Sequence, residues 1–323
     1  MPRKAETAEL STFQQKLIGT WTNQSLPGTN KGDKDDPYSY TVMPLPQQSP
    51  QQGANLGYVL KNFTYFETIV FNGPDAVTAP AAAPNRGGGY QQIPFVLFYD
   101  QQIRLAEGPD IGAIVHEENG AWLHLTTGKQ QVGPYLYPPT NPVFEPGHPI
   151  PQSPERTMCK QISVPHGVSV LALGSFEECT GEPKIPVAPS VLPTPDDIDT
   201  SPYGAVLNTP DNYQNPRPEL TQQINLPLQN AIEDLAAAGH AVSNYIYCRV
   251  ESTNGGTVVN IPFEQRKAAL AGYNAEYWLL SFDGGQNYDI LAYTQRILLD
   301  IVVGENRYTF PHPTSNVLTR STV

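Results

Sequence analysis

Two histidines stand beside prolines in apolar, strand-like stretches, and imidazole is the side chain that most readily binds a metal or moves a proton near neutral pH. His166 follows Pro165 in "QISVPHGVSVLALG", and His312 lies between Pro311 and Pro313 in "YTFPHPTSNVLTR". Proline has no N–H to donate to a sheet, so we expect both strands to be broken at these points. A rigidly held imidazole suits an axial metal ligand, and the alternative is a structural histidine at the end of a barrel.

A second group of residues surrounds the predicted hairpin turn at Asn119–Gly120. His116 and His124 flank that turn and Glu117 is adjacent, which makes a metal site of two histidines and a carboxylate conceivable, although the spacing matches no metal signature. The motifs GxSxG and HExxH and the P-loop do not occur. The glycine-rich run after Arg86 opens no predicted helix, so it is interpreted as a turn.

Composition excludes several classes of function. The chain has 323 residues, a net charge of −12, and only 15% charged residues, so it does not attract nucleic-acid phosphates. Three cysteines without a CxxC pair argue against a zinc ribbon and a disulfide scaffold. The first residues contain no apolar signal region, and no apolar run approaches the length of a membrane span. We therefore expect a cytoplasmic protein without a membrane span.

The spacing of apolar residues predicts an all-β fold of about ten short antiparallel strands, with long proline-rich loops and one short helix. The last long strand alternates from Leu291 to Val303 with Gln295 as the polar exception, which is typical of a barrel wall. The helix is predicted over 226–240, "LPLQNAIEDLAAAGH", and "DGGQN" predicts a hairpin turn. We expect residues 1–16 to form an N-terminal arm and 17–323 a single barrel domain, with a proline-rich and helical insertion at about 181–240.

Several stretches, taken in order, resemble the bacterial heme-binding β-barrel proteins, which are similar to nitrobindins: "LIGTWTNQSLPG", "PNRGG", "GAIVHEENGAWLHL", "SVPHGVSVLALG" and "YTFPHPTSNVLTR". The resemblance implies a lipocalin-like barrel that carries b-type heme. It assigns Thr20 and Trp21 to the opening strand and Trp122 to a strand pair in the middle of the barrel. It makes His312 the proximal heme ligand. His166 then either faces the open side of the iron or is itself the ligand, with His312 structural.

The same resemblance suggests reaction with a small ligand such as peroxide or a nitrogen oxide, as in a peroxidase or a peroxynitrite isomerase. His166 would act as general base and then acid, and Arg86 would stabilise developing negative charge. Tyr293 and Trp122 belong to a set of aromatic residues that would line the heme pocket. The alternatives are a heme-free, lipocalin-like carrier of a hydrophobic small molecule, and a structural protein whose arms at 134–154 and 181–226 wrap neighbours. Such arms predict a homo-oligomer.

Overall fold

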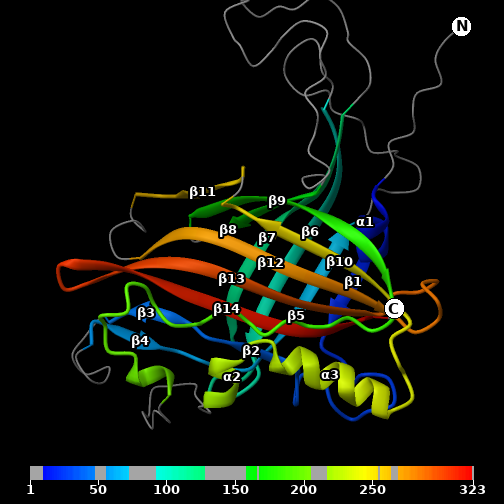
Figure 1. Cartoon of the computed structure of the whole chain (residues 1–323), viewed down its shortest axis with the longest axis horizontal. Coiled ribbons are helices and arrows are strands. Elements are labelled where there is room, and N and C mark those ends of the chain that lie inside the picture. The colour runs from blue at the N-terminus through cyan, green and yellow to red at the C-terminus, as the bar shows by residue number, and fades with distance from the viewer. Residues whose placement is uncertain are drawn as a thin grey trace, which may run out of the picture.

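A computed structural model describes residues 10–47, 56–72, 92–127, 158–165, 167–204, 217–253, 255–262 and 268–321. Ten antiparallel strands close into a barrel, which confirms the predicted fold class (Figure 1). Each strand pairs with the next along the barrel wall, and the last pairs with the first. In order around the barrel they are β1 (Gly19–Thr22), β5 (Tyr65–Asn72), β6 (Gln92–Leu105), β7 (Ile114–Thr127), β8 (Met158–Val164), β9 (Val168–Thr180), β10 (Asn244–Glu251), β12 (Ala268–Ser281), β13 (Ile290–Val303) and β14 (Asn306–Arg320).

Of four shorter strands, two extend this wall and two form a sheet of their own. β2 (Ser39–Thr41) pairs with β14, and a bridge from Thr41 to Phe63 closes the gap toward the start of β5. β11 (Thr257–Asn260) pairs with β9, while β3 (Pro44–Pro46) and β4 (Tyr58–Leu60) form a separate hairpin. The predicted turn at 283–287 does connect β12 to β13, and Gly284 and Gly285 there adopt positive φ.

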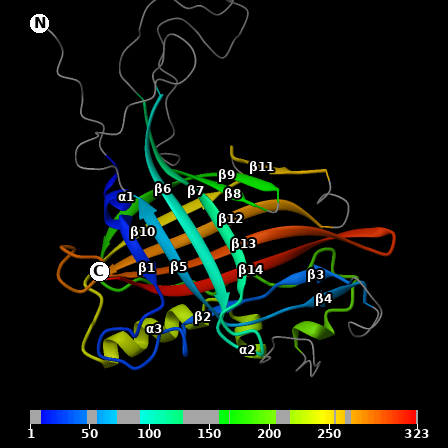
Figure 2. The same ribbon diagram turned by 180° about the vertical axis from the view of Figure 1, so that it is seen from behind.

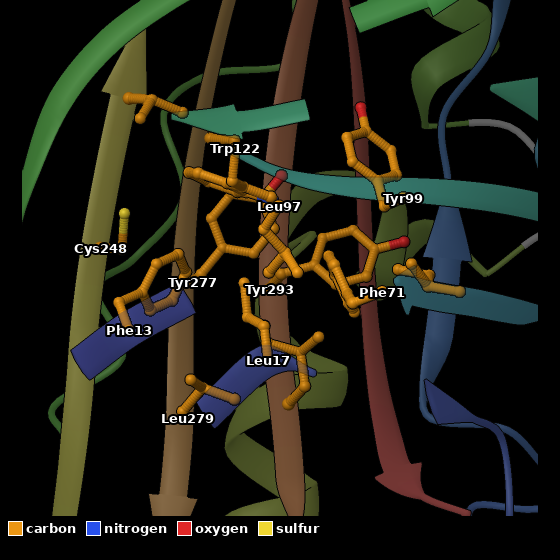
Figure 3. Close-up of a cluster of buried hydrophobic side chains, with 14 of the residues drawn as sticks. Phe13, Leu17, Phe71, Leu97, Tyr99, Trp122, Cys248, Tyr277, Leu279 and Tyr293 are labelled. Atoms are coloured by element: carbon orange, nitrogen blue, oxygen red, sulfur yellow. The ribbon is translucent and has the colours of Figure 1, made fainter. Parts of the chain in front are cut away.

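Helix α1 (Thr12–Leu17) seals one end of the barrel from inside. Ser11 and Gln14 form a reciprocal capping box that starts the helix. Phe13 is fully buried, with its ring centroid 5.1 Å from that of Trp122, and Leu17 is buried beside it (Figure 3). The predicted arm over 1–16 therefore contains most of a helix that belongs to the barrel core.

The segment after β9 lies on the outside of the barrel. It contains a 3₁₀ helix (Ser201–Tyr203), α2 (Pro218–Gln222) and α3 (Leu226–Ala237), and α3 matches the helix predicted over 226–240 except for its last three residues. The apolar face of α3 packs on outward-facing side chains of β12, β13 and β14 (Figures 1 and 2). The contacting residues include Leu228, Ile232, Leu235, Trp278, Ala292 and Val317. Within the described ranges, no helix is long and apolar enough to cross a membrane.

The predicted strand break at Pro311 and Pro313 is wrong, because β14 runs unbroken through both prolines. Val42 donates its N–H to the Pro313 carbonyl and Val317 donates to Tyr38, so odd-numbered residues of β14 direct their backbone groups toward the β2 side. On that side β14 pairs with β2 over only three residues. The long ladder with β13 uses the N–H groups of even-numbered residues, and neither proline is at an even position. Both prolines therefore occupy positions where a missing donor costs little. The break predicted at Pro165 is confirmed, because a turn there separates β8 from β9.

The predicted hairpin turn at Asn119–Gly120 is also wrong, because β7 continues straight through it. Gly120 serves close packing: a Cβ at this position would lie 2.0 Å from the Gln161 carbonyl oxygen. His116 and His124 therefore stand eight residues apart on one strand, or about 26 Å at 3.3 Å per residue. Among the residues that the structure describes, no cluster of three or more His, Cys, Asp or Glu side chains could hold a metal ion.

Candidate functional site in the barrel lumen

The lumen changes from apolar to polar along its length. Its sealed end is an apolar cluster around α1 that includes Phe13, Leu97, Trp122 and Leu279 (Figure 3). Toward the other end, the lumen face of β7 passes from Trp122, 1% exposed, through Glu118, 8% exposed, to the half-buried His116, beyond which a β-bulge turns Ile114 to the outer face opposite Arg104. The lumen face of β14 likewise runs from the buried Asn316 to the half-buried His312. We call the level of His116 and His312 the mouth of the barrel.

A buried carboxyl, Glu67 of β5, organises one wall of the polar layer. Gln101 donates its amide to Oε1 at 2.7 Å, and the amide of Asn316 donates to Oε2 at 2.9 Å. The Tyr293 hydroxyl also donates to Oε2, and it lies 3.2 Å from the Tyr65 hydroxyl. Burial raises the pKa of Glu67 to about 7, although these hydrogen bonds oppose the shift. Glu67 therefore titrates near neutral pH.

An ion pair, Lys160 with Glu118, occupies the facing wall. The Lys160 ammonium donates to Glu118 Oε1 at 3.2 Å and to the hydroxyls of Tyr277 and Tyr273 at 3.0 and 3.2 Å. It also lies 5.1 to 5.6 Å from the ring centroids of Tyr99, Tyr273 and Tyr277, within the range of cation–π attraction. The nitrogen therefore sits in a cage of three tyrosines.

Glu118 connects this cage to the mouth. The Tyr99 hydroxyl donates to Glu118 Oε1 at 2.6 Å, and the other oxygen lies 3.5 Å from His116 Nε2. Burial alone would raise the pKa of Glu118, but the Lys160 ammonium and the contacts with His116 and Tyr99 hold it at about 2. Glu118 is therefore a carboxylate at neutral pH, whereas burial moves the Glu67 pKa toward neutrality.

The described polar layer encloses very little space. A cavity of about 10 Å³ lies between the Lys160 cage and the Glu67 wall, enough for about one water molecule. Its lining includes Ile69, Phe71, Tyr99, Gln101, Trp122, Lys160, Tyr277, Tyr293 and Gln295. A porphyrin does not fit at this depth.

His312 faces this lumen from β14, since its position in the strand has the same parity as Asn316 and Thr314 and lies opposite Ile297 of β13. Its Nδ1 lies 2.7 Å from the Val42 carbonyl oxygen. Because a carbonyl oxygen only accepts, Nδ1 carries the proton and Nε2 keeps its lone pair. Burial lowers the pKa of His312 to about 4. The hydrogen bond to the Val42 carbonyl opposes this shift, and the electrostatic interaction with nearby His116 adds to it. The imidazole is thus neutral at pH 7 with one nitrogen held by the backbone.

The other residues predicted from sequence are spread along the chain. Trp122 and Tyr293 both lie in the lumen, and Tyr277 contacts both rings at centroid distances of 5.1 and 5.7 Å. Trp21 is fully buried at the sealed end, donating its indole N–H to the Leu17 carbonyl. Thr20, its neighbour in β1, is half-buried on the opposite face of the strand. His166 and Arg86 lie outside the described residues.

Sequence reasoning missed most of the polar lumen: Glu67, Gln101, Glu118, Lys160, Tyr99, Tyr273 and Asn316. One signal was present for Glu67, which has the same strand parity as Tyr65, Ile69 and Phe71 in "YFETIVF" and so shares their buried face. A charged residue at a core-facing position of an alternating strand is a functional or structural feature by default. Gln295 was noted only as the polar exception on its strand face, and its amide oxygen accepts from the Tyr273 hydroxyl at 2.7 Å.

Comparison with known proteins adds no family to this geometry. No protein-family model matches the chain, and no curated protein matches it either.

Proposed function

We propose that the barrel binds b-type heme at its mouth, with His312 as the axial ligand. The observation that carries this proposal is the contact between His312 Nδ1 and the Val42 carbonyl oxygen. Histidines that bind metals through one ring nitrogen commonly donate the other N–H to a carbonyl or carboxylate, which fixes the tautomer and the ring direction. A pKa of about 4 keeps His312 neutral and able to coordinate over most of the physiological pH range.

The donor chemistry at the mouth fits a heme, whereas the deeper lumen does not. Trp122 and Trp21, which the family resemblance suggested as cofactor contacts, lie at the sealed end against α1. Trp122 is six residues from His116 on the same strand, or about 20 Å at 3.3 Å per residue. Of the predicted cofactor contacts, only His312 lies among the described residues at the mouth, and the rest of the binding surface would have to form around it.

Bound heme would supply the iron chemistry for reaction with a small ligand such as peroxide or a nitrogen oxide. The protein would supply His312 as the ligand and a second imidazole, His116, as the group that accepts and returns a proton. Glu118 Oε2 lies 3.5 Å from His116 Nε2, close enough to orient the imidazole. The role expected for His166 stays a prediction.

Hemin titration followed by visible absorption tests the proposal. The purified protein should develop a Soret band, and His312→Ala should weaken hemin binding by at least about tenfold, as loss of a group that holds a metal centre does. His240→Ala is the matched control, because His240 lies beyond the end of α3, outside the barrel, and should leave binding unchanged. Absence of a Soret band, or equal binding by both variants, would refute the assignment.

The acid limit of binding gives a second readout. Because the pKa of His312 is about 4, hemin affinity should be constant from pH 8 to pH 5 and should fall as protonation begins near pH 4. A loss centred at the ordinary histidine value of 6.5 would show that another imidazole is the ligand. The heme-free carrier is the rival function, and it would be supported if protein from its own host carried an organic ligand and no iron by native mass spectrometry.

A further inference from the structure

A second cavity lies on the outer face of the barrel, away from the lumen. Its volume is about 250 Å³, roughly that of a small organic molecule. The segment Pro186–Pro189 forms one wall together with Ile224, and outward-facing side chains of β10, β12, β13 and β14 form the other. In Figure 1 the chain that follows β9 passes along the outside of the barrel beside β14 before it reaches the short helices. The cavity is thus roofed by the segment after β9.

Two polar atoms in the wall of this cavity have no hydrogen-bond partner in the described structure, and they are of opposite kind. Asn225 is 1% exposed, and its amide nitrogen donates to the Pro186 carbonyl at 2.9 Å, which leaves Oδ1 as a buried acceptor without a donor. Arg296 is half-buried, and its Nε–H is a buried donor without an acceptor. A buried polar atom without a partner costs free energy, so each atom is suited to a ligand group that reaches and satisfies it.

The charge of the cavity favours an anion. Arg249 and Arg296 both line it, against one carboxylate, Glu276. Arg249 also lies 3.7 Å from Glu251, and Arg296 Nη2 donates to the Ser190 carbonyl at 3.3 Å. Asn274 and Thr294 complete the polar lining. The remaining wall is proline and aliphatic: Pro186, Val187, Ala188, Pro189, Ile224 and Pro313. The ligand should therefore combine a carboxylate, an N–H donor and a small apolar group.

We propose that this outer cavity is a binding site for an N-acylated amino acid, with the ligand's carboxylate on Arg296 and its amide N–H on Asn225. Guanidinium–carboxylate contacts are strong and directional, and they are the usual means by which proteins recognise carboxylates. The amide N–H satisfies the Asn225 oxygen, and the apolar side chain or acyl group lies against the proline wall. This site is independent of heme binding at the mouth.

Isothermal titration with N-benzoylglycine tests the proposal directly. The unmodified protein and the His312→Ala variant should both bind it, which separates this site from the heme proposal. N-Benzoylsarcosine lacks the N–H and the methyl ester of N-benzoylglycine lacks the carboxylate, and each should bind about tenfold or more weakly, as expected for loss of one hydrogen bond to a polar or charged partner. Benzoyl-triglycine distinguishes a free acyl amino acid from the C-terminal end of a peptide, since only a peptide site should bind it as tightly.

Variants supply the matched comparison. Arg296→Gln should weaken binding of N-benzoylglycine by about tenfold or more. Arg307→Gln should not, because Arg307 is an exposed residue at the start of β14 and does not line the cavity. Asn225→Ala should also bind weakly, with its fold checked by thermal unfolding; if it does not fold, the arginine pair decides. No measurable binding at several millimolar, or equal affinity in Arg296→Gln and Arg307→Gln, would overturn the proposal.

Discussion

Replacing Lys160 by methionine should be strongly destabilising, because it leaves the Glu118 carboxylate buried in the lumen without its partner. Lys160 and Glu118 are 4% and 6% exposed in their side chains, and the nitrogen and oxygen are 3.2 Å apart. Breaking one half of such a buried pair typically costs about 3–5 kcal/mol. The double variant Lys160→Met/Glu118→Gln should lose less than the sum of the two single variants, since neither charge then remains.

The pH dependence gives the sharper form of this prediction. In the unmodified protein the pKa of Glu118 is lowered from 4.5 to about 2, so its contribution to stability is present above pH 4.5 and is lost as pH falls toward 2. A shift of that size corresponds to roughly 3 kcal/mol at 1.36 kcal/mol per pH unit. Without Lys160, burial is no longer offset and the Glu118 pKa rises. The cost of Lys160→Met should therefore be largest near pH 7 and shrink in acid.

Urea unfolding followed by tryptophan fluorescence at pH 7 and pH 4 measures both effects. Lys184→Met, at an exposed lysine, is the control and should change the unfolding free energy by no more than about 0.5 kcal/mol. If Lys160→Met costs less than about 1 kcal/mol at pH 7, or the same amount at both pH values, the ion pair does not make the contribution worked out from its burial.

Three further predictions concern the rest of the lumen. Because the pKa of Glu67 is raised from 4.5 to about 7, its contribution to stability is complete below pH 4.5 and is lost as pH rises through about 7. Glu67→Gln should therefore flatten the decline in unfolding free energy between pH 5 and 8. An unchanged slope would contradict this. Gly120→Ala should lower the unfolding free energy by about 3 kcal/mol or more, since its Cβ would lie 2.0 Å from the Gln161 carbonyl oxygen. Gly204→Ala is the control: a Cβ there meets open space, so the same denaturant titration should show little change. Phe13→Ala should cost about 3–5 kcal/mol by removing the plug from the sealed end, and a loss below 1 kcal/mol in thermal unfolding would argue that α1 does not support the barrel.

Local patterns in the sequence were sufficient for the fold class and for several elements. Alternation along β5 and β13, the turn at 283–287 and the apolar spacing of α3 all involve residues close in the chain, and each was recognised correctly. The two errors share a cause. Asn119–Gly120 and the prolines around His312 carry turn-like and strand-breaking signals, but the neighbouring strands decided their conformation, through close packing at Gly120 and through the partly paired side of β14.

The lumen site was beyond local reasoning for a related reason. Lys160 and Glu118 are 42 residues apart, and Glu67 and Tyr293 are 226 apart. No local pattern reports which strands become neighbours around a closed barrel, because that depends on long-range pairing. The sequence by itself therefore determined an antiparallel β-barrel with a histidine on its last strand. Only the tertiary structure decided that this histidine faces a lumen filled with tyrosines, an ion pair and a carboxyl whose pKa is raised to about 7. The physical reason is that closing the barrel buries those polar groups, and each buried polar group needs a hydrogen-bond partner.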